Sequence, residues 1–146
     1  MNISNKGIIT LSFDCEAKWG MADRDPKWLF KLTNDAVMDS YRYIFEQLEK
    51  CNIPATFAFV GAMTESKDEF IDKYAPSLTG SNHTKWLQPI ISKVDEEGWF
   101  FPEILDFFNE FQDHEIASHG YTHIPFNWMT DDEVRQELNH VENWSS

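Results

Sequence analysis

The residues best suited to chemistry are two histidines, His119 and His123, one helical turn apart directly after a strand-like apolar run. A second group, Asp14 and Glu16, stands at the end of another apolar run. In parallel α/β folds the carboxyl ends of the strands carry the chemistry. Two imidazoles and a carboxylate at such ends can bind one divalent metal ion. We therefore predict a single metal site.

The spacing of the carboxylates favours two different roles. Side chains alternate along a strand, so Asp14 and Glu16 point to one side and Cys15 to the other. One carboxylate can then bind the metal while the other accepts a proton from the attacking water. Three alternatives stay open: carboxylates that cap the next turn or face solvent, a surface or helix-capping histidine pair, and Cys15 as a metal thiolate.

This ligand set favours hydrolysis. Two imidazoles and one carboxylate leave positions open for water and a substrate oxygen, which suits cleavage of an amide or ester. The same set serves non-haem Fe(II) oxygenases. Those enzymes commonly use antiparallel jelly rolls, whereas the pattern of this chain is parallel.

Composition limits the class of protein. A chain of 146 residues can form one domain with a real core. Its net charge of −13, without clustered lysine or arginine, argues against nucleic acid as a partner. We find no signal-peptide pattern and no run of membrane-spanning length, and the two cysteines form no disulfide framework or zinc ribbon. We therefore expect a cytoplasmic protein without a membrane span.

The apolar patterns predict a β-α-β-(insertion)-α-β-α order, and hence parallel strands joined by right-handed crossovers. The expected buried strands are 7–13, 55–60 and 114–118, and the expected helices begin near 34, 102 and 130. Asn52 can end the first helix in a left-handed conformation. Thr130 and Glu133 form a capping box for the last one.

The segment at about 63–100 is the least regular, and we expect a functional loop or an insertion with two short helices. His83 and Trp86 could contact substrate from it, although a solvated insertion is the simpler interpretation.

Three sequence blocks carry a resemblance to a known family. They are Leu11 to Glu16, Pro54 to Gly61, and His114 to His123. In this order they resemble the polysaccharide deacetylases of the NodB-homology type, within the glycoside hydrolase/deacetylase superfamily. The helix from Thr130 also resembles the one that follows the histidine motif in that family.

The resemblance implies a deformed (β/α) barrel and a metal-dependent hydrolase that removes acetyl groups from N-acetylated sugars of a polysaccharide or glycoconjugate. It implies Asp14 as catalytic base and His119 and His123 as metal ligands. The family's usual second aspartate is replaced by Cys15, so Glu16 fits a branch in which the third ligand lies one residue later. The implied cofactor is one divalent metal, zinc first, with Co, Mn, Ni or Fe as alternatives.

Three later family motifs, with an arginine, an Asp-Trp pair and a histidine acid, have no counterpart here. We therefore expect residues 1–146 to be the N-terminal half of a single catalytic domain. A homo-oligomer or a completing chain could then cover the unfinished sheet. Alternatives are an inactive half-barrel, a glycan-binding fragment, and an enzyme acting on other C–N bonds, such as cyclic amides.

Overall fold

The computed structural model describes residues 7–24, 27–74, 80–93, 95–111 and 113–145. The strands are β1 (Ser12–Cys15), β2 (Thr56–Phe59) and β3 (Glu115–Ser118), and the helices are α1 (Asn34–Cys51), α2 (Lys67–Tyr74), α3 (Ser81–Ile91), α4 (Ile104–Asn109) and α5 (Asp131–Trp144). Short 3-10 turns lie at Trp19–Met21, Leu29–Lys31, Gly61–Thr64 and Phe126–Trp128. This order confirms the alternation expected from the sequence.

The three strands form one parallel sheet in the order β1-β2-β3. Phe13 pairs with Phe57, and Phe57 pairs with Ile116, so the three strands end close to the same level. The prediction of a parallel α/β arrangement is confirmed. The described residues form an open three-stranded sheet, and a closed barrel is not formed within them.

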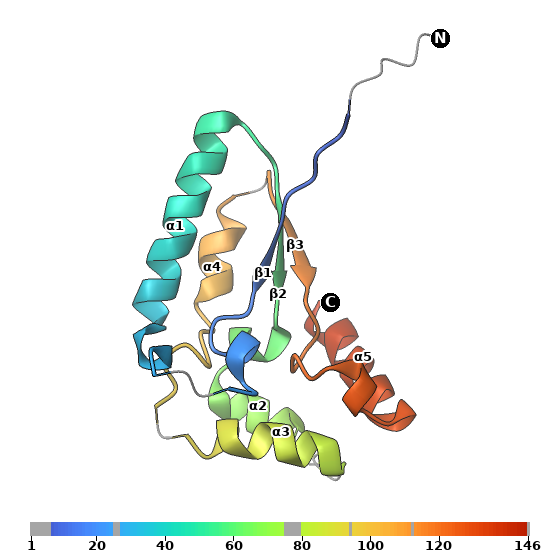
Figure 1. The fold of residues 1–146 in the computed structure, drawn as a ribbon. Helices are drawn as coiled ribbons and strands as arrows, with labels where there is room; N and C mark the ends of the chain where they lie inside the picture. Colours follow the sequence, from blue (N-terminus) through green and yellow to red (C-terminus); the bar gives the residue numbers. More distant parts are fainter. Residues whose placement is uncertain (1–6, 25–26, 75–79, 94, 112, 146) are drawn as a thin grey trace, which may run out of the picture.

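Helices α1 and α4 cover one face of the sheet (Figure 1). Phe57 of β2 is fully buried there, with its ring 4.7 Å from Phe45 of α1 and 4.9 Å from Phe108 of α4. Helix α1 has the predicted end, since Asn52 takes the left-handed conformation with φ 51°. This aromatic packing fixes the strands, and with them the positions of their carboxyl ends.

The opposite face of the sheet carries small or polar side chains. The side chains that alternate with the buried phenylalanines include Asp14, Ala58 and Ala117, which are paired across the three strands. Asp14 is exposed on this face, and Ala117 is partly exposed. The carboxylate of Asp14 is therefore accessible to solvent near the carboxyl end of β1.

The first strand is shorter than predicted. We expected residues 7–13 to be a buried strand, but pairing starts at Ser12, and Ile8 and Ile9 are 90% and 89% exposed. The partner strand starts only at Thr56, whose N–H donates to the carbonyl of Leu11. An apolar run cannot be buried where the described part of the chain places no element against it.

The segment 63–100 is not the solvated insertion that we considered. It contains α2 and α3, and Phe70, Leu87 and Ile90 belong to the buried core. His83 is only 1% exposed, so it does not contact substrate from the surface. Both helices lie near the end of the sheet to which the strand arrows point, as does α5 (Figure 1).

Helix α5 begins as its sequence predicts. The hydroxyl of Thr130 accepts a hydrogen bond from the N–H of Glu133, whose side chain accepts one from the N–H of Thr130. None of the helices in the described residues is long and apolar enough to cross a membrane.

Candidate metal centre

Three of the predicted residues come together at the carboxyl end of the sheet. The Oε1 atom of Glu16 lies 3.0 Å from Nε2 of His119 and 3.4 Å from Nε2 of His123. One donor atom from each residue lies within 4.8 Å of the other two. All three side chains are about one quarter to one third exposed, so the cluster is open to solvent on one side.

Glu16 reaches this place because of how β1 ends. Cys15, the last residue of the strand, points into the core, so the next side chain points to the open face. The chain then turns, and the N–H of Trp19 donates to the carbonyl of Glu16 at 2.8 Å. A Cβ atom at Gly20 would lie 1.8 Å from Oε2 of Glu16, so only glycine leaves room for this carboxylate.

The two histidines flank a tight loop that continues β3. The N–H of His119 donates to the carbonyl of Phe59 at 2.7 Å and extends the sheet by one residue. Gly120 has φ +83° and His123 has φ +59°, so both are in the left-handed region. Such a conformation is unfavourable for histidine and persists only where surrounding contacts hold it.

Helix α5 supplies those contacts. The Oε1 atom of Glu137 accepts hydrogen bonds of 2.7 Å from the N–H groups of both Tyr121 and Thr122. Its Oε2 atom accepts a third, of 2.9 Å, from the hydroxyl of Thr122. Glu137 is 1% exposed. A buried carboxylate with several charge-assisted hydrogen bonds holds the histidine loop in shape.

Asp14 lies beside the cluster but outside it. Its Oδ1 atom is 3.9 Å from Nδ1 of His119, and its side chain is 58% exposed. That distance is too long for a direct hydrogen bond. Asp14 therefore borders the site on the open face, where its carboxylate is accessible to water.

The structure argues against Cys15 as a ligand. Its side chain is fully buried in the core, and burial raises the pKa of the thiol to about 12. A thiolate is the form that binds metal, and this environment disfavours it. Among Asp14, Cys15 and Glu16, the carboxylate of Glu16 is the one that groups with the two histidines.

Two of the three separations between donor atoms suit a small divalent cation. With metal–ligand bonds of about 2.1 Å, neighbouring ligands of a tetrahedral ion are about 3.4 Å apart. The separations of 3.0 and 3.4 Å from Glu16 are close to that value. Two imidazoles and one carboxylate would leave the fourth position open, as catalytic zinc sites require.

Comparison with known families gives an independent result. The family described as Polysaccharide deacetylase matches residues 22–144, which is most of the chain. The chain belongs to the polysaccharide deacetylase family. Searches of the curated proteins and of the solved structures give no match.

The match begins after both carboxylates. Asp14 and Glu16 lie before residue 22, while the two histidines lie within the matched range. The family match therefore covers the segment that carries the histidines, and the assignment of individual site residues depends on the geometry of the site. The place of the carboxylates in the site depends on the geometry of β1 and the turn that follows it.

Sequence reasoning missed two residues of this site. Glu137 lies three residues after Val134 and four before Val141, so it is on the same, inner face of α5. An acidic residue at this apolar spacing could have indicated a buried carboxylate. Gly20 gave no signal, because its importance comes from a close approach of the Glu16 side chain.

Proposed function

We propose that this chain is a metal-dependent hydrolase that removes acetyl groups from N-acetylated sugars of a polysaccharide or glycoconjugate. The observation that carries the proposal is the convergence of Glu16, His119 and His123 in a chain of the polysaccharide deacetylase family. We assign these three residues as metal ligands and zinc as the preferred ion, because two imidazoles and one carboxylate form a ligand set of catalytic zinc sites. Co, Mn, Ni and Fe remain the alternatives.

When bound, a divalent ion at this site would polarise the acetyl carbonyl and lower the pKa of water. Asp14 then serves as the general base. Its exposed carboxylate borders His119 on the open side of the site, where it can take the proton that water loses as its oxygen attacks the acetyl carbon. The same carboxyl group can deliver that proton to the sugar nitrogen as the C–N bond breaks.

The direct test compares Asp14→Asn with the unaltered chain after loading with zinc. The variant should keep about one zinc per chain and lose about 10²–10⁴-fold in acetate release from N-acetylated oligosaccharides. Asp39→Asn, an exposed carboxylate on α1, is the matched control and should keep its activity. Full turnover by Asp14→Asn would exclude Asp14 as the base.

A second candidate function is a non-catalytic portion of a barrel that needs further chain or a partner. The exposure of Ile8 and Ile9, just before β1 in the chain, favours it, because β1 is an edge strand of the sheet in the described residues and an exposed apolar run next to an edge strand invites another chain. Size-exclusion chromatography with elemental analysis separates the two candidates. A monomer with about one zinc per chain supports an autonomous site, and a metal-free aggregate supports the second candidate.

A further inference from the structure

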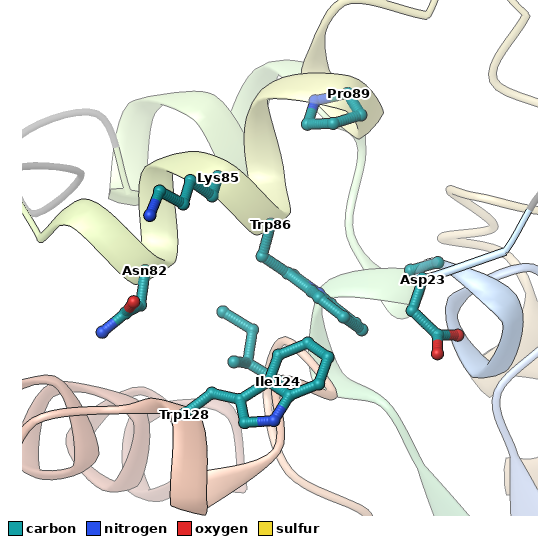
Figure 2. Close-up of a pocket in the computed structure, with 8 residues that line it drawn as sticks. Asp23, Asn82, Lys85, Trp86, Pro89, Ile124 and Trp128 are labelled. Carbon is teal, nitrogen blue, oxygen red and sulfur yellow. The ribbon is translucent and has the colours of Figure 1, made fainter.

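A cavity lies between α3 and the segment that follows His123. Its volume is about 510 Å³, within the range of small-molecule sites. Its walls are formed by Ala22, Asp23, Asn82, Lys85, Trp86, Pro89, Ile124 and Trp128. Figure 2 shows the two indole rings in the middle of this group, with Asp23 on one side and Asn82 and Lys85 on the other.

The two tryptophans make an aromatic corner. Their ring centroids are 5.7 Å apart and the ring planes meet at 75°. The indole N–H of Trp86 donates to the carbonyl of Thr122 at 3.1 Å, which fixes that ring to the histidine loop. Trp128 is 50% exposed. A half-exposed indole held against a second one offers a flat apolar surface to a ligand.

The polar groups of the cavity are mixed and nearly balanced in charge. Asp23 and Lys85 carry opposite charges, and Asn82 has both a donor and an acceptor in its side chain. The Nδ2 atom of Asn82 donates to Glu133 at 3.2 Å, which steadies the amide. A cavity of this kind suits a neutral ligand with many hydroxyl groups better than a charged one.

Residues on both chain segments that carry the candidate metal ligands also line this cavity. Asp23 follows Glu16 on the loop after β1, and Ile124 directly follows His123. Ile124 also lines a neighbouring cavity of about 490 Å³ that is bordered by His119 and His123. A ligand that extends past Ile124 would therefore contact residues of both cavities.

We propose that this aromatic corner binds a second sugar unit of the same chain whose acetylated unit lies at the candidate metal centre. The apolar C–H face of a pyranose ring would stack on Trp128, and its hydroxyl groups would bind Asp23, Asn82 and Lys85. The identity of the ligand as a sugar chain rests on the proposed function. The result is an enzyme that prefers an oligomer to a single sugar.

The experiment measures binding by titration calorimetry with EDTA-treated protein, so that the metal plays no part. The probes are the tetramer of N-acetylglucosamine and the N-acetylglucosamine monomer. The unaltered chain should bind the tetramer clearly more tightly than the monomer. Trp128→Ala should weaken tetramer binding about fivefold to tenfold, and Trp128→Phe should restore most of it.

Trp28→Ala is the matched control, because Trp28 is 45% exposed and does not line this cavity. It should bind the tetramer like the unaltered chain. Equal affinity for tetramer and monomer, or equal losses in Trp128→Ala and Trp28→Ala, would overturn the proposal.

Acetate release by the zinc-loaded chain distinguishes the two proposals. Tetramer binding that depends on Trp128, without any acetate release, supports the sugar subsite and contradicts the proposed function. The opposite outcome is acetate release that is equal for monomer and tetramer and unchanged in Trp128→Ala. This outcome would support the proposed function and exclude the sugar subsite.

Discussion

The carboxylate of Glu137 on α5 accepts a 2.7 Å hydrogen bond from the N–H of Thr122, the residue before His123. This contact joins two segments that meet only in the folded chain. It fixes the loop in which His123 has a left-handed backbone. The candidate metal centre therefore depends on α5 as well as on the strand ends.

Glu137→Gln should lower zinc affinity about 10–100-fold, because a neutral amide oxygen accepts the two N–H groups more weakly than a carboxylate does. The NH2 group of glutamine also cannot accept the hydrogen bond that the hydroxyl of Thr122 donates to Oε2. Competition with a chromophoric chelator measures the affinity, and far-UV circular dichroism checks the fold. Glu142→Gln, an exposed site on the same helix, is the control and should bind zinc normally. Unchanged affinity in Glu137→Gln would refute a positioning role for this residue.

Gly20→Ala should weaken zinc binding about tenfold or more without altering any ligand, because the new methyl group would displace the carboxylate of Glu16. Gly7→Ala is a suitable control, since a Cβ there would meet nothing within 4 Å. Both affinities can be measured by the same chelator competition. Equal zinc binding by the two variants would mean that Glu16 reaches its place by another route.

The two thiols should differ in reactivity. Cys15 is buried and Cys51 is exposed, so iodoacetamide should modify Cys51 in the native chain and reach Cys15 only after unfolding. Mass spectrometry of digested samples would locate the label. Rapid labelling of Cys15 in the native state would contradict its place in the core.

The free energy of unfolding should decrease in acid, in part because Glu133 becomes protonated. Hydrogen bonds from the N–H of Thr130, and then from Asn82, lower the pKa of Glu133 from 4.5 to about 2. The carboxyl group of Glu133 therefore binds a proton less readily in the folded chain than in the unfolded chain. The stabilisation is complete above pH 4.5 and is lost as the pH falls towards 2.

Glu133→Gln should therefore be less stable than the unaltered chain at pH 6, with a smaller difference at pH 3. Urea unfolding at the two pH values measures the change. Glu142→Gln again provides the control, because its exposed side chain should leave both midpoints nearly unchanged. A constant difference between Glu133→Gln and the unaltered chain would argue against this linkage.

Local features were predictable from the sequence. The start of α5 at Thr130 and the left-handed end of α1 at Asn52 follow from contacts within a few residues. That the carboxylates after β1 would lie near the two histidines was also predictable, because parallel strands bring their carboxyl ends to one edge. The family match over residues 22–144 confirms the resemblance that the sequence blocks indicated.

Other features were decided by contacts between distant residues. The exposure of Ile8, the burial of His83 and the inward direction of Glu137 depend on which elements pack against each segment. A hydrophobic or acidic residue has no fixed environment until those elements are in place. The sequence by itself determined which residues could bind a metal. The tertiary structure decided which carboxylate meets the imidazoles, because only folding sets the distance between groups about one hundred residues apart.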